Sequence, residues 1–130
     1  MTSPVARFRI DFAPHCSVGP GKIALLEGIR RSGSLSQAAR DLRMSYRRAW
    51  QLLASLNESF REPVAVTATG GAGGGGARLT PFGKELVELY RAFEQDTQAR
   101  AATSFKQVVR KVRRAPRGPS AARPVRLSGR

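Results

Sequence analysis

Several hydrogen-bonding side chains near the middle of this sequence have types and spacing that suit a defined chemistry. Arginine can donate two parallel hydrogen bonds to guanine, and glutamine can pair in the same way with adenine. Arg47, Arg48 and Gln51 supply such groups on one face of an expected helix, which Ser45 and Ser55 share. The alternative is that Arg47 and Arg48 only keep the surface of the helix solvated, as most charged residues on helices do. The acid-poor segment and the pattern of elements around it favour contact with DNA.

Two helices joined by a tight turn are expected to position these side chains. Ser34 followed by Gln37 is the pattern of a capping box, which begins a short helix. A turn through residues 43–44 leads to Ser45, an expected N-cap, and to a longer helix over residues 45–60. The apolar stripe expected to face the core comprises Tyr46, Ala49, Trp50, Leu53, Leu56 and Phe60. This arrangement predicts a helix-turn-helix.

A helix-turn-helix places its second helix in the major groove of DNA and its first across the phosphate backbone. The candidate base-contacting residues are therefore Arg47, Arg48 and Gln51. Residues near the start of the first helix are suited to phosphate contacts: Ser34, Ser36 and Gln37. Tyr46 and Trp50 could also stack on bases, but their spacing favours packing in the core.

A hairpin is expected after these helices. Residues 64–69 have the composition of a strand, residues 70–76 contain six glycines, and residues 77–79 resume extended structure. Three of the glycines also satisfy the G-x-G-x-x-G pattern of dinucleotide sites, but no second parallel strand is expected to follow the next helix. We interpret the glycine run as the flexible tip of a wing, with Arg78 near a phosphate or the minor groove.

Further helices and a strand are expected before the helix-turn-helix and after the hairpin. Residues 7–12 alternate polar and apolar, which predicts a strand whose partner comes later and whose buried face has Phe8, Ile10 and Phe12. Residues 14–21 then break the chain, and a helix follows that stops at Gly33. A last helix begins after Thr80, with Pro81 as its first residue. Its apolar stripe comprises Phe82, Leu86, Leu89, Tyr90, Phe93 and Thr97. This stripe is too long for one small core, so a partner helix could cover the part that the core leaves exposed.

Composition limits the chain to one modest domain and a tail. The 130 residues carry 23 basic and 9 acidic residues, and a net charge of +14 implies an anionic partner. Residues 106–130 contain nine of the basic residues, no acidic residue and several prolines, which predicts a helical beginning and a disordered end. We therefore expect a domain over residues 1–105 and a basic tail over 106–130. A membrane-surface helix over residues 105–114 is a weaker alternative.

Other classes of protein are poorly supported. Cys16 and His15 are the only residues of their types, and neighbours in sequence point apart, so we expect a loop there and neither catalysis nor a metal site. No cofactor is expected. There is no run of apolar residues long enough to span a membrane and no signal peptide, so the expected location is the cytoplasm.

Residues 9–93 resemble the N-terminal domain of the ModE family of molybdate-responsive transcription regulators. The resemblance rests on SGSLSQAARDLRMSYRRAW, ATGGAGGGGARLT and PFGKELVELY, and the G-S-x-S-x-A-A part is shared with LysR-type regulators. It implies a winged helix-turn-helix that dimerises through its first strand and long last helix. It also implies that Ser45, Tyr46, Arg47 and Gln51 lie in or beside the groove, and that the operator is palindromic and near molybdenum-related genes.

The fold we expect is mainly α with a small β wing, a winged helix-turn-helix with a long C-terminal dimerisation helix. The expected function is a bacterial, homodimeric regulator that binds double-stranded DNA and is associated with the nucleoid when bound. The alternative is a nonspecific architectural protein that binds through its basic tail. ModE-family sensors bind molybdate in C-terminal oligomer-binding-fold domains, and the short basic tail is not expected to form one or to bind molybdate.

Overall fold

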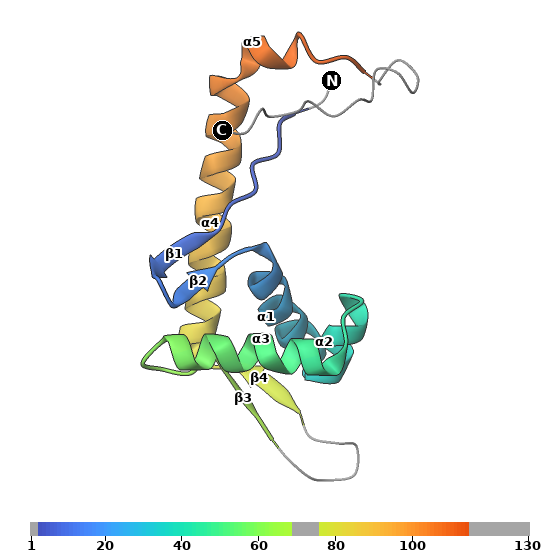
Figure 1. Cartoon of the computed structure of the whole chain (residues 1–130), viewed down its shortest axis with the longest axis vertical. Helices are drawn as coiled ribbons and strands as arrows, with labels where there is room; N and C mark the ends of the chain where they lie inside the picture. Colours follow the sequence, from blue (N-terminus) through green and yellow to red (C-terminus); the bar gives the residue numbers. More distant parts are fainter. Residues whose placement is uncertain (1–2, 69–75, 115–130) are drawn as a thin grey trace, which may run out of the picture.

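The computed structural model describes residues 3–68 and 76–114. It confirms the predicted fold, a helical body with a small β wing and a long helix near the end (Figure 1). The elements in chain order are β1 (Ile10–Ala13), β2 (Cys16–Val18), α1 (Pro20–Ser32), α2 (Leu35–Asp41), α3 (Tyr46–Ser59), β3 (Ala65–Thr67), β4 (Ala77–Leu79), α4 (Pro81–Ser104) and α5 (Lys106–Val109).

Side-chain caps fix the starts of three helices where the sequence predicts them. The Oγ of Ser34 accepts from the backbone N–H of Gln37 at 3.1 Å, and the Oγ of Ser45 accepts from that of Arg48 at 3.0 Å. The hydroxyl of Thr80 caps α4 in the same way, through Gly83 N–H at 3.0 Å. At the other end of α1, Gly33 has a left-handed φ of 72° and stops the helix as expected.

Small residues allow α1, α2 and α3 to approach one another closely. Ala38 and Ala39 of α2 and Ala49 of α3 are buried. A Cβ built on Gly28 of α1 would lie 3.0 Å from the Cβ of Ala38, so α1 and α2 also pack tightly. Arg43, in the turn between α2 and α3, has a φ of 57°, a left-handed conformation that reverses the chain direction over few residues.

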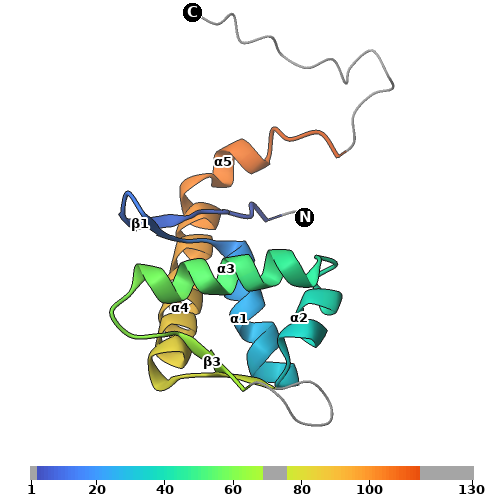
Figure 2. The ribbon, with the colours of Figure 1, turned by 60° about the horizontal axis from the view of Figure 1, so that its bottom comes forward.

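The core lies around α1. Its buried side chains include Ile23, Leu25, Leu26 and Ile29, which have no exposed surface. Figure 2 shows α1 between α2 and α4, with α3 running across the three. The core therefore holds α3 by one side and leaves its other side to solvent.

The first strand differs from its prediction. It is shorter, and its partner β2 follows directly in an antiparallel hairpin, where we had expected a loop around Cys16. The register shifts between Asp11 and Ala13, so Phe12 is an extra residue on β1 and is 56% exposed. The prediction that Phe12 shares a buried face with Phe8 and Ile10 is therefore wrong.

The wing is a two-stranded antiparallel hairpin in which Ala65 pairs with Leu79 and Thr67 with Ala77. The backbone N–H of Ala77 donates to the carbonyl of Gly33 at 2.9 Å, which ties the wing to the end of α1. The predicted glycine-rich tip falls almost wholly on residues 69–75, outside the described part of the chain.

Helix α4 extends well beyond the body, and the N-terminal segment runs back along it (Figure 1). The side chain of Gln98 binds both the N–H and the carbonyl of Ala6, and the hydroxyl of Tyr90 donates to the carbonyl of Phe8. Leu89 and Phe93 are still 61% and 52% exposed, as expected for an apolar stripe too long for one core.

Candidate nucleic-acid interface

Helix α3 presents a polar, basic face to solvent at the end that begins with Ser45. Ala49, Leu53 and Leu56 are buried and hold the opposite side in the core. The predicted base-contacting residues Arg47, Arg48 and Gln51 are all exposed. Ser45, the N-cap of α3, and Ser55, further along the helix, are also exposed, so all five of these predicted site residues are accessible to solvent along α3.

Tyr46 and Trp50 do not pack in the core as their spacing had indicated. Each is 55% exposed, and the prediction that they face inward is wrong. The buried stripe of α3 follows Ala49, Leu53 and Leu56. At about 100° per residue, Tyr46 lies roughly 50° and Trp50 roughly 90° from the centre of that stripe. Trp50 is thus a candidate interface residue that the sequence analysis assigned to the core, and the narrower Ala-Leu-Leu stripe was the signal that could have placed it correctly.

Among residues 3–68 and 76–114, the two arginines on this face form no ion pair with an acidic residue. The ion pairs among the described residues engage Arg9, Arg30, Arg31 and Arg91, and none involves Arg47 or Arg48. The first acidic residue of α3 is Glu58, near its C-terminal end. An unpaired cationic surface of this kind attracts the phosphates of a nucleic acid.

The predicted phosphate contacts at the start of α2 are placed less uniformly. Ser36 is exposed, whereas Ser34 and Gln37 are half-buried. Ser34 caps α2 with its hydroxyl oxygen, and the side chain of Gln37 binds Asp41 and Arg40 at 2.8 and 2.9 Å. Of the two hydrogen bonds of a capping box, the one to the Ser34 hydroxyl is present, whereas the Gln37 side chain binds Asp41 and Arg40 and not the backbone of Ser34. The phosphate-binding role of these residues stays a prediction.

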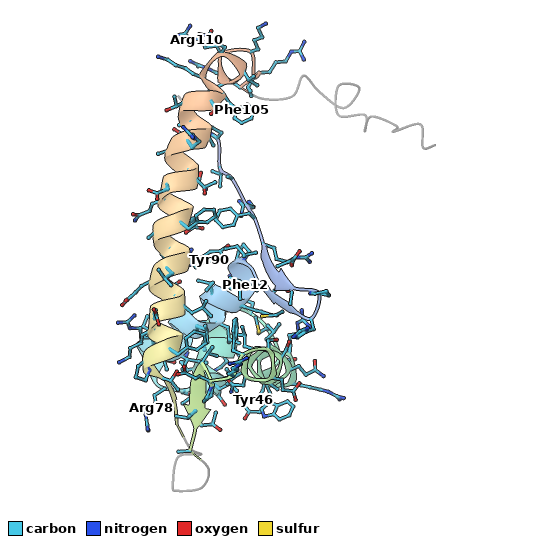
Figure 3. The ribbon with its side chains drawn as sticks, turned by 90° about the vertical axis from the view of Figure 1, so that its left-hand side faces the viewer. Phe12, Tyr46, Arg78, Tyr90, Phe105 and Arg110 are labelled. Atoms are coloured by element: carbon cyan, nitrogen blue, oxygen red, sulfur yellow. The ribbon has the colours of Figure 1, made fainter. Side chains whose placement is uncertain are left out.

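The wing carries the last predicted site residue. Arg78 is exposed between the buried Ala77 and Leu79 on β4. Figure 3 shows Arg78 and Tyr46 at the same end of the molecule, with the hairpin between them in that view. Arg78 therefore does not join the cluster on α3 and would contact a different part of any DNA bound there.

Asn57 fixes the wing relative to α3, a role that the sequence did not indicate. Its Oδ1 accepts from the backbone N–H of Val64 at 2.7 Å, and its Nδ2 donates to the carbonyl of Ala65 at 3.1 Å. Both bonds are made from the last turn of α3 to Val64 and Ala65, at the start of β3. The orientation of the wing is thereby coupled to the helix that carries the basic face.

Other kinds of site find little support in the described residues. Within residues 3–68 and 76–114, no three or more His, Cys, Asp or Glu side chains are grouped so that they could hold a metal ion. Cys16 is buried as a free thiol in β2. Among the helices of this part of the chain, none is both long and apolar enough to cross a membrane.

Comparison with protein families agrees with this geometry. Residues 21–84 match the model of the family described as bacterial regulatory helix-turn-helix protein, lysR family. The matched range contains α2, the turn at Arg43, α3 and the wing. Residues 21–84 are thus a LysR-type helix-turn-helix domain.

The resemblance to the ModE regulators is confirmed by individual relatives. The chain is 37% identical over 95 residues to the molybdenum transport protein ModE of Azotobacter vinelandii, covering 73% of this chain and 35% of that protein. It is 41% identical over 90 residues to the molybdenum-pterin-binding protein MopB of Rhodobacter capsulatus (69% and 33%). It is 43% identical over 79 residues to the DNA-binding transcriptional dual regulator ModE of Escherichia coli K12 (61% and 30%). The chain spans about a third of the length of these relatives.

Proposed function

We propose that this protein is a transcription regulator that binds specific sequences in double-stranded DNA, with the N-terminal half of α3 in the major groove. The observation that carries the proposal is the exposed, acid-free face of α3, where Arg47, Arg48 and Gln51 lie side by side in a LysR-type helix-turn-helix. In such a domain the first residues of the second helix contact base edges. The start of α2 and Arg78 of the wing supply phosphate contacts on either side.

The regulator acts as a homodimer in this proposal. Leu89 and Phe93 leave an apolar face of α4 exposed, and Phe8 of the N-terminal segment packs beside Phe93 with ring centroids 5.4 Å apart. A second copy of the chain would cover this face and place two reading helices about one DNA turn apart. Leu89→Glu should then convert a dimer into a monomer in sedimentation analysis. A wild-type protein that is monomeric when bound to DNA would contradict this part of the proposal.

Molybdenum-related genes are the proposed targets, because the relatives' names refer to molybdenum. A protein with this role works in the cytoplasm, on the nucleoid. Mapping of the DNA bound in the native host, together with selection from random duplexes in vitro, tests the proposal. We expect one palindromic motif in both experiments, upstream of genes for molybdenum uptake or use. Binding without an enriched motif would contradict sequence-specific regulation, and a motif at unrelated genes would contradict the molybdenum assignment.

A nonspecific architectural protein is the second candidate, favoured by the nine basic residues among positions 106–130. In that case the tail supplies most of the affinity through release of counterions from DNA. Removing residues 106–130 separates the two candidates. The regulator keeps its preference for the selected motif and loses part of its salt-dependent affinity, whereas the architectural protein loses nearly all binding.

A further inference from the structure

Two large aromatic rings lie in water on the helix that we place in the major groove. Tyr46 and Trp50 are both more than half exposed, and both belong to the N-terminal half of α3. Figure 3 shows Tyr46 and Phe105 at opposite ends of the molecule. Phe105 follows the C-terminal end of α4, so Tyr46 lies at the end of the molecule where α4 begins. The exposed apolar face proposed for dimerisation is on α4, so the rings on α3 need a different partner.

The geometry of α3 keeps the two rings together. Residues four apart lie on the same side of a helix, and their Cα atoms are about 6 Å apart along its axis. Successive base pairs of DNA are about 3.4 Å apart. Tyr46 and Trp50 therefore span about two base-pair steps, on the flank of the face that carries Arg47 and Gln51.

The major groove offers such rings one kind of apolar group. Guanine, cytosine and adenine present hydrogen-bond donors and acceptors there, whereas thymine also presents its C5-methyl group. Contact with a methyl group buries apolar surface of the ring and of the base, which neither arginine nor glutamine can do as well. A hydroxyl or indole N–H bond to phosphate would leave most of each ring exposed to water.

We propose that Tyr46 and Trp50 recognise thymine by contact with its C5-methyl group, at two thymines no more than about two base pairs apart in each half-site. The proposal rests on the function proposed above, with α3 in the major groove. Tyr46 and Trp50 thus recognise thymine through apolar contact, while Arg47, Arg48 and Gln51 recognise their bases through hydrogen bonds.

Replacing thymine by uracil in the selected operator tests the proposal. The change removes only the methyl group and keeps the base pair, and each thymine of one half-site is replaced in turn. For the wild-type protein we expect a loss of affinity of about three- to fivefold at each of two nearby thymines, as for one buried methyl group. In Trp50→Ala one of the two thymines should lose this sensitivity, and in Tyr46→Ala the other should lose it.

The controls separate methyl recognition from general effects. Phe105→Ala removes an aromatic ring that is 53% exposed at the far end of α4, and it should keep sensitivity at both thymines. The uracil scan on the wild-type protein needs no variant, so it shows whether thymine methyl groups are recognised even if a variant folds poorly. Trp50 is the only tryptophan, so its fluorescence reports the contact directly and should change when the operator binds.

Three results would overturn the proposal. The first is that no uracil substitution weakens binding of the wild-type protein. The second is that Trp50→Ala and Tyr46→Ala bind less tightly but keep full sensitivity to both methyl groups. The latter result would assign the rings to phosphate contacts. Fluorescence that does not change on binding would place Trp50 outside the interface. If selection yields no operator at all, the proposed function fails first, and the two failures are therefore distinguishable.

Discussion

Arg91 of α4 and the two arginines of α3, Arg47 and Arg48, have opposite surroundings. Arg91 of α4 binds Glu27 of α1 with two nitrogens and also binds Glu94, so its charge serves to hold two helices together. Arg47 and Arg48 on α3 have no such partners among the described residues. The number of basic residues on a helix therefore does not identify an interface, because their acidic partners must also be considered. Changes on the α4 side should lower stability, whereas changes on the exposed face of α3 should lower DNA binding.

The largest effect on stability is expected at Gly83, where α4 meets the wing. A Cβ at this position would lie 1.9 Å from the carbonyl oxygen of Val64, so one of the two backbones must move. Gly83→Ala should lower the free energy of unfolding by about 3 kcal/mol, measured by chemical denaturation. Gly21→Ala is the matched control, because no atom outside its chain neighbours and the backbone of its own helix would lie within 4 Å of its Cβ, and it should leave stability unchanged or raise it by up to about 1 kcal/mol. Equal effects of the two changes would contradict the close packing of α4.

Asn57 lies on α3, the helix proposed to bind DNA, and its side chain also stabilises the fold. Asn57→Ala removes the partners of the Val64 N–H and the Ala65 carbonyl and should cost about 1–3 kcal/mol of stability. It should also weaken binding to the operator, because the wing is no longer held to α3. Glu58→Ala, one residue on and exposed, should change stability by less than about 0.5 kcal/mol. Unchanged binding by a folded Asn57→Ala protein would show that the wing makes no contribution.

A smaller effect, dependent on pH, is expected from the Arg91 pair. The hydrogen bonds from Arg91 lower the pKa of Glu27 below its ordinary value of 4.5. The stabilisation is therefore complete above that value and is lost as the pH falls through the lowered pKa. Arg91→Met should cost about 1 kcal/mol at neutral pH, because the pair is partly exposed, and the difference from wild type should shrink in acid. A difference that is constant with pH would contradict this role.

The sequence predicted the features that depend on neighbouring residues. The caps at Ser34, Ser45 and Thr80 and the stop at Gly33 are local hydrogen bonds and backbone conformations, so residue type and spacing determine them. The family resemblance, which rests on contiguous motifs, was also confirmed.

Features that depend on packing between distant elements were not predicted. Whether Tyr46 and Trp50 face the core depends on how α3 is rotated on α1 and α2, which the apolar pattern leaves open. Phe12 is turned outward by a register shift that appears only when β1 pairs with β2. The bonds of Asn57 reach a strand that begins eight residues later in the chain, and no local pattern marks them.

The central claim is that the exposed face of α3 reads the base sequence, and Arg47→Ala tests it most directly. The measurement is the ratio of affinities for the selected operator and for random DNA, with Arg100→Ala on α4 as a control of equal charge. Loss of a base contact by Arg47→Ala should lower this ratio by about 10- to 100-fold, while Arg100→Ala leaves it unchanged. Equal losses of affinity on operator and random DNA in Arg47→Ala would show that Arg47 contacts only phosphate and would contradict the account.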